Sequence, residues 1–140
     1  MAVDKDKLRS KLQHVREAVR RLEDIRSRGR EAFINEWLLQ AAAERSLQVA
    51  VEAVLDIANH IVAQEGWGLP GSYREALEIL LREGVLPQEK AQDFLQMVSF
   101  RNRIVHLYDQ VDPETVFTII EHNLGDLEVM IRAVVQRYLS

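Results

Sequence analysis

The stretch that decides the fold is residues 31–64, EAFINEWLLQAAAERSLQVAVEAVLDIANHIVAQ. Its apolar residues recur at helical spacing, which predicts one long amphipathic helix. The stretch GWGLPG at residues 66–71 should end it, because glycine and proline break a helix. The positions expected to face the core are Phe33, Trp37, Ala41, Leu47, Val51, Val54, Ala58 and Ile61.

Four further segments carry the same spacing. The first should end near Gly29, since glycine tolerates positive φ at a helix C-terminus. Ser72 and Glu75 form a capping-box pattern before a short helix. Asp112-Pro113 is typical of the N-cap and first residue of the last helix. Their expected core positions are Leu8, Leu12, Val15, Val19, Leu22 and Ile25, then Leu77, Leu80 and Leu81, then Phe94, Met97, Val98 and Val105, and finally Val116, Ile120, Leu124, Leu127, Ile131, Val134 and Tyr138.

No segment alternates as a β-strand does. We therefore expect an all-α, up-and-down bundle of about five helices, forming a single domain over residues 1–140. Trp37 and Trp67 are expected to pack within it, and His14 and His122 to be surface or structural residues. The chain has 47% hydrophobic and 29% charged residues and no cysteine, which excludes a disordered chain and a thiolate zinc site. Without a signal peptide or a long apolar run it is expected to be cytoplasmic and independent of membranes.

Charge is distributed unevenly along the chain. Residues 1–30 contain ten Lys/Arg and five Asp/Glu, whereas residues 31–140 contain eight and seventeen, for an overall net charge of −4. This balance argues against a globally basic nucleic-acid-binding protein. Any contact with RNA has to be local, through an arginine cluster or the basic first helix. The alternative is that the N-terminal charges form a solvated helix face.

The polar residues best suited to chemistry lie in FRNRIVHLY, residues 100–108. At 100° per residue, Arg101 and Tyr108 lie about 20° apart, and Asn102 and His106 about 40° apart. Arg101 and His106 are about 140° apart and cannot converge from one straight helix. Either the helix loosens before His106, or two copies face each other in a symmetric dimer.

Arginine and histidine together suit the cleavage of RNA. Arginine offers permanently charged donors to the phosphate oxygens, which gain negative charge in the transition state. Histidine titrates near neutral pH and can transfer the protons. RNA supplies its own nucleophile, the ribose 2′-hydroxyl, so Arg101 and His106 need neither metal nor cofactor. The alternative is structural: Arg101 forms a helix ion pair and His106 is a buried core residue.

The pattern Arg101-x4-His106-x-Tyr108, with Asn102 after the arginine, resembles the signature of the HEPN superfamily and, within it, of HepT toxins. The resemblance spans roughly residues 5–139. It also rests on ERSLQVAVE at 44–52, DIANH at 56–60, SYREA at 72–76, GVL at 84–86 and VD at 111–112.

The resemblance implies a homodimeric ribonuclease toxin that cleaves tRNA or mRNA. Arg101 and His106 would be catalytic, with Asn102 and Arg103 in support. Its implied partner is an MntA-type minimal nucleotidyltransferase antitoxin, which transfers AMP to Tyr108. The chain would hold no cofactor of its own. The alternatives are a non-catalytic HEPN binding module that partners a nucleotidyltransferase, and a helical dimer whose polar groove is purely structural.

A second polar set recurs every four residues on the long helix: Glu44, Gln48, Glu52, Asp56 and His60. Steps of four residues drift around a helix and give a slanted stripe. One interpretation has the stripe facing the dimer groove and pairing with Arg101 or Arg103, so that Glu52, Asp56 and His60 line the groove. The others are a solvated ridge, and a metal site at Asp56 and His60, although nothing supplies a complete ligand shell.

Overall fold

The computed structural model describes residues 3–105 and 112–140. This part of the chain contains no strand, which confirms the all-α prediction. It forms six α-helices rather than about five: α1 (Lys5–Ser27), α2 (Arg30–Asn35), α3 (Trp37–Glu65), α4 (Tyr73–Arg82), α5 (Ala91–Val105) and α6 (Pro113–Val134). A 3-10 turn, Gln88–Lys90, precedes α5, and a π-helical turn, Val135–Leu139, continues α6.

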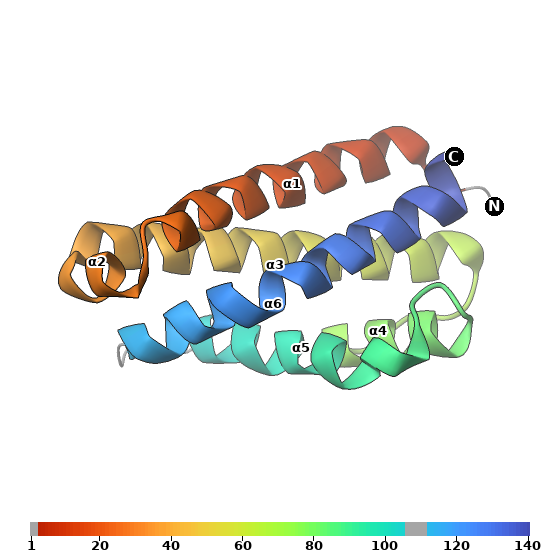
Figure 1. Cartoon of the computed structure of the whole chain (residues 1–140). Helices are drawn as coiled ribbons and strands as arrows, with labels where there is room; N and C mark the ends of the chain where they lie inside the picture. Colours follow the sequence, from red (N-terminus) through yellow and green to blue (C-terminus); the bar gives the residue numbers. More distant parts are fainter. Residues whose placement is uncertain (1–2, 106–111) are drawn as a thin grey trace.

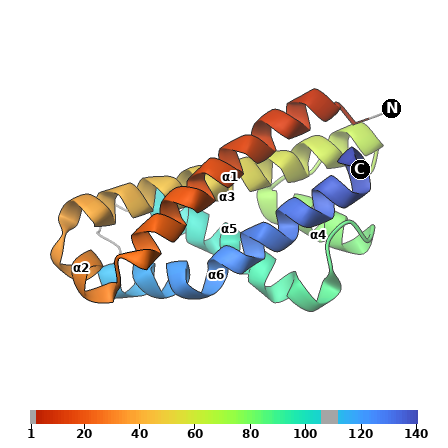
Figure 2. The same ribbon diagram turned by 45° about the horizontal axis from the view of Figure 1, so that its top comes forward.

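The helices are arranged around α3, which contacts α1, α2, α4, α5 and α6. Figure 1 shows α1 and α3 side by side and antiparallel, with α6 running between α1 and the layer formed by α4 and α5. Turned by 45°, the bundle shows α1 passing in front of α3, with α6 running below them (Figure 2). In both views α5 ends, and α6 begins, at the end of the bundle that carries α2.

The predicted helix over residues 31–64 is wrong in one respect, because the structure divides it into α2 and α3. Glu36 has an extended backbone, with φ −122 and ψ 105. The side-chain amide of Gln40 donates to the carbonyls of Phe33 and Ile34, both at 3.0 Å. The bond to Ile34 satisfies a carbonyl at the end of α2, and the bond to Phe33 adds to a long 3.4 Å bond from the Glu36 amide. The turn therefore needs neither glycine nor proline.

The turn also exposes residues that were expected in the core. Trp37, in the first turn of α3, is 72% exposed, and Ala41 is exposed one turn later. Trp67 does pack against the core, as predicted. Nearly all the other predicted core positions are buried in one hydrophobic cluster; Tyr138 is only partly buried, and the Val105 side chain lies outside the described set.

Local capping signals match the structure closely. Gly29 and Gly66 have φ of 90 and 73 and lie just beyond the ends of α1 and α3. Ser72 Oγ accepts from the Glu75 amide at 3.1 Å, and Asp112 Oδ1 accepts from the Glu114 amide at 3.2 Å. These residues fix the connections that place α4 and α6 against α3.

By length and composition, α3 could cross a membrane, since it contains a window with a mean hydropathy of 1.3. However, 56% of that window is buried inside the bundle, as in the central helix of a folded domain.

Candidate active site

Arg101 lies near the end of α5 and faces α3 and α4. Its Nε is 3.7 Å from Glu52 Oε1 on α3. Its Cζ is 5.2 Å from the centre of the Tyr73 ring on α4, a cation–π distance. The arginine side chain is 23% exposed. The structure thus joins the motif arginine to the polar stripe of α3 within a single chain.

The guanidinium of Arg101 is not saturated with hydrogen bonds. Its Nε is buried and has no hydrogen-bond partner among the described residues, because 3.7 Å to Glu52 is too long for a hydrogen bond. One terminal nitrogen donates to Asn102 Oδ1 at 3.3 Å. A buried donor without an acceptor costs free energy. Arg101 is therefore held in place by charge and by an aromatic face, and its second terminal nitrogen, which bonds no described residue, is left for an anionic ligand.

Tyr73 connects this arginine to a second carboxylate. Its hydroxyl donates to Asp56 Oδ1 at 3.4 Å, and Lys11 Nζ lies 3.9 Å from Asp56 Oδ2. Burial, and then the charge of Asp56, raise the pKa of Tyr73, so the phenol stays protonated at neutral pH. The result is a connected set of Lys11, Asp56, Tyr73, Arg101 and Glu52 from α1, α3, α4 and α5.

Sequence reasoning gave Tyr73 no role in this set. Its segment contributed to the family resemblance, but spacing within α4 does not show that the ring lies against Arg101. The contact depends on how α4 folds back on α3, and no local pattern reports that packing. Lys11 was likewise only one of many charges in a basic helix.

The other members of the stripe differ from Glu52 and Asp56. Gln48 Nε2 donates weakly to Glu52 Oε1 at 3.4 Å. Burial raises the pKa of Glu44. Burial, and then the charge of Lys7, lower the pKa of His60, whose Nε2 is buried and has no partner among the described residues. Among residues 3–105 and 112–140 there is no cluster of three or more potential metal ligands, so Asp56 and His60 are not part of one.

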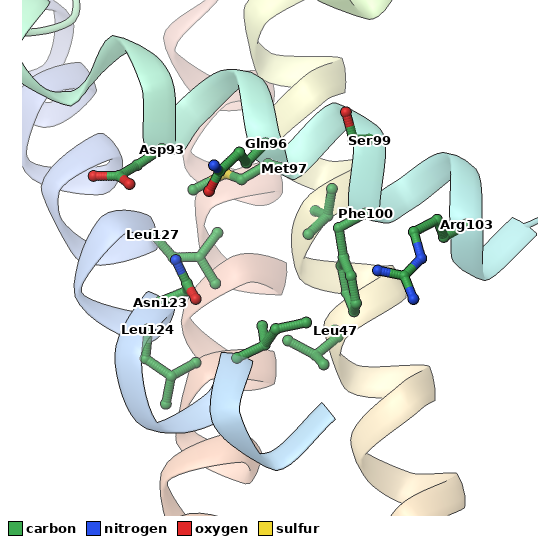
Figure 3. Close-up of a pocket in the computed structure, with 12 residues that line it drawn as sticks. Leu47, Asp93, Gln96, Met97, Ser99, Phe100, Arg103, Asn123, Leu124 and Leu127 are labelled. Carbon is green, nitrogen blue, oxygen red and sulfur yellow. The ribbon is translucent and has the colours of Figure 1, made fainter. Parts of the chain in front are cut away.

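Arg103 is exposed and lies on another side of α5. It lines a cavity of 250 Å³ between α3, α5 and α6, together with Phe100, Leu47 and Asn123 (Figure 3). Within the described part of the chain it forms no ion pair with the stripe on α3. The structure does not bring Arg101 and Arg103 together.

His106 and Tyr108 lie outside the described residues. The convergence expected between Arg101 and His106, and the position of the tyrosine beside Arg101, therefore stay predictions. The helix α5 is regular up to Val105, the residue before His106.

Comparison with known proteins gives the family. Residues 15–134 match the ribonuclease HepT-like family. The chain is 30% identical over 122 residues to an mRNA nuclease HepT of Shewanella oneidensis, which covers 87% of this chain and 91% of that protein. It is also 30% identical over 102 residues to a tRNA nuclease HepT of Aphanizomenon flos-aquae, covering 73% of this chain and 69% of the relative.

Solved structures agree with this assignment. The tri-AMPylated HEPN toxin of Shewanella oneidensis, in complex with its MNT antitoxin, superposes with a TM-score of 0.86 and 28% identity. The match covers 95% of this chain and 99% of that one. Sequence and fold together therefore show that the chain belongs to the ribonuclease HepT-like family of HEPN toxins.

Proposed function

We propose that this protein is the toxin of a toxin–antitoxin pair and a metal-independent endoribonuclease with Arg101 and His106 at its active site. The observation that carries the proposal is the environment of Arg101: Glu52 and Tyr73 hold it, and one of its two terminal nitrogens makes no hydrogen bond with a described residue. An arginine in this state is preorganised for an anion. The mRNA and tRNA nucleases among its relatives support RNA as the substrate.

The proposed reaction is a transesterification within RNA. The ribose 2′-oxygen attacks the phosphorus and loses its proton, while the bond to the 5′-oxygen breaks and that oxygen gains a proton. The products are a 2′,3′-cyclic phosphate and a 5′-hydroxyl. Arg101 stabilises the negative charge that builds up on the phosphate oxygens. His106 transfers one of the two protons, and Asn102 restrains Arg101 through their 3.3 Å contact.

We further propose that the active unit is a homodimer. On one straight helix Arg101 and His106 lie about 140° apart, so a cleft shared by two copies is the simplest way to present both to one phosphate. Glu52 and Asp56 would line that cleft on either side of Tyr73. Arg103 is exposed on another side of α5, so any support it gives to RNA binding would be away from Arg101.

The proposed antitoxin is an MntA-type nucleotidyltransferase that transfers AMP to Tyr108. The AMP-carrying HEPN toxin bound to an MNT antitoxin supports this proposal. An added AMP places a phosphate near Arg101 and competes there with the substrate. The pair is expected to act in the cytoplasm, where its RNA is found, and needs no membrane.

A cleavage assay in EDTA tests the catalytic proposal. Purified wild-type protein should cut RNA and leave cyclic-phosphate ends, whereas Arg101→Ala and His106→Ala should lose at least two orders of magnitude in rate, as expected for an oxyanion-type donor or a general acid–base group. His122→Ala is the matched control, because His122 is exposed on α6. RNA that His106→Ala cuts as fast as wild type would refute the role of this histidine.

The second candidate function is a non-catalytic HEPN module that binds a nucleotidyltransferase. The acidic balance of residues 31–140 favours it, because this part of the chain repels RNA. Expression without the partner separates the two. A ribonuclease toxin should arrest growth in a way that Arg101→Ala abolishes, whereas a binding module should not arrest growth at all.

A further inference from the structure

A groove with one basic wall, formed by α1, runs between α1 and α3 on the face that carries the candidate site. It has a volume of 410 Å³. Its chemistry is set by Lys7, Lys11 and His14 from α1 and by Arg45, Glu52 and Asp56 from α3. Positions 7, 11 and 14 are separated by steps of four and three, which places them on one face of α1. Part of the positive charge of the N-terminal segment is thus directed at α3.

The groove is continuous with the candidate active site through two shared carboxylates. Glu52 lines the groove and lies 3.7 Å from Arg101 Nε. Asp56 lines it too, and accepts from the Tyr73 hydroxyl at 3.4 Å. A chain lying in this groove would therefore pass directly beside Arg101.

The local charge has the opposite sign to that of the whole protein. Lys7, Lys11 and Arg45, together with Arg101, outnumber the carboxylates Glu52 and Asp56, whereas the protein carries a net charge of −4. Both carboxylates already have a cation nearby, at Arg101 and Lys11. Lys7 and Arg45 are exposed and form no ion pair with another described residue. Their charge is therefore directed at solvent along the groove.

The position of the groove between two packed helices favours one strand over a duplex. Packed helices lie about 8–10 Å apart, so the furrow between two neighbours admits a single extended chain. Proteins that bind single strands combine a positively charged groove along the phosphate backbone with aromatic side chains on which bases stack, and this groove supplies the first of these two features. A polyanion repelled by the rest of the surface would be guided to this local excess of positive charge.

We propose that the groove between α1 and α3 is the track along which single-stranded RNA reaches Arg101, with Lys7, Lys11 and Arg45 binding its phosphates. The inference rests on the proposed ribonuclease function and adds the path of the substrate. It also explains how an acidic protein binds RNA: the contact is confined to one furrow.

The test measures binding without cleavage. The probe is a single-stranded 2′-O-methyl RNA oligonucleotide, which lacks the nucleophilic hydroxyl, and its affinity is measured over a range of salt concentrations. Each phosphate contact with a single strand contributes about 0.7 to the slope of log affinity against log salt. The double variant Lys7→Gln with Arg45→Gln should therefore reduce the magnitude of the slope by about 1.4.

The matched control removes the same charge from another face of the same bundle. Arg16 and Arg20 are exposed on α1 and line a separate depression against α6, with Arg132. Arg16→Gln with Arg20→Gln should leave the slope at its wild-type value. Both double variants change only surface side chains, and their circular dichroism and melting temperature should match those of wild type.

Two results would overturn the inference. Equal losses in the two double variants would mean that RNA responds only to overall charge. If the Lys7 and Arg45 double variant kept the same salt dependence as wild type, RNA would not follow this groove. If the variant also lost affinity for the nucleotidyltransferase, the groove would be a protein-docking surface instead. Neither result depends on cleavage, so a failure of the proposed catalysis would be recognised separately, in the EDTA assay.

Discussion

Replacing Tyr73 tests whether its ring positions Arg101. The arginine Cζ lies 5.2 Å from the ring centre, and its side chain is 23% exposed. A cation–π contact is worth roughly 0.5–1 kcal/mol at exposed sites and about 2 kcal/mol when desolvated, which gives about 1 kcal/mol here. If the contact is needed to hold the guanidinium in its reactive position, its loss in Tyr73→Leu should reduce the single-turnover rate constant of cleavage about fivefold. Tyr73→Phe keeps the ring and loses only a long hydrogen bond of 3.4 Å to Asp56.

The assay is single-turnover cleavage of RNA in EDTA, with melting temperatures recorded in parallel. Tyr73→Phe should stay within about twofold of wild type, because a long hydrogen bond contributes well under 1 kcal/mol. Tyr73→Leu should lose rate without a matching loss of substrate affinity. Equal losses in both variants would show that the hydroxyl matters and the ring does not. A Tyr73→Leu rate equal to wild type would refute the positioning argument altogether.

Three further predictions concern other parts of the chain. A hydrogen bond with Glu23 is the main cause of the raised pKa of Glu128. Protonated Glu128 therefore stabilises the folded protein at low pH, and this stabilisation is lost as the pH rises through the pKa that Glu128 has in the folded state. Glu128→Gln should therefore melt at a higher temperature than wild type at pH 7, with a smaller difference near pH 4; the opposite order would contradict the assignment. Gln40→Ala removes the side-chain amide that donates to the carbonyls of Phe33 and Ile34 at the end of α2. The free energy of unfolding in urea titrations should fall by about 1–2 kcal/mol. An unchanged midpoint would show that water replaces the amide. Tyr108→Phe should stay toxic but escape neutralisation by the nucleotidyltransferase, and mass spectrometry that still finds AMP on this variant would exclude Tyr108 as the sole acceptor.

Those parts of the fold that depend on neighbouring residues could be predicted from the sequence. The Ser72 and Asp112 caps and the glycines after α1 and α3 act within a single turn, and the structure has them where the pattern indicated. The division between α2 and α3 could not be predicted in this way. It depends on hydrogen bonds from the Gln40 side chain to carbonyls on the other side of Glu36, whose backbone is extended. The apolar pattern continues through this turn without a break and therefore does not indicate it.

The same distinction holds for the candidate site. The four-residue spacing correctly indicated a polar stripe that includes Glu52, and the motif supplied Arg101. That Glu52 rather than His60 lies against the arginine depends on the register between α3 and α5. Tyr73 enters only through the packing of α4. Spacing along one helix cannot determine such registers, because they are set by side-chain volumes across the whole interior.

The Nε of Arg101 is buried and has no hydrogen-bond partner among the described residues, which shows that this side chain is not fully bonded in the free protein. Any anion that binds the folded protein at Arg101 raises the melting temperature according to its affinity and concentration. A thermal-shift screen of uncleavable oligonucleotides would therefore rank cellular RNAs as targets, without any need to know beforehand which message or tRNA the toxin attacks.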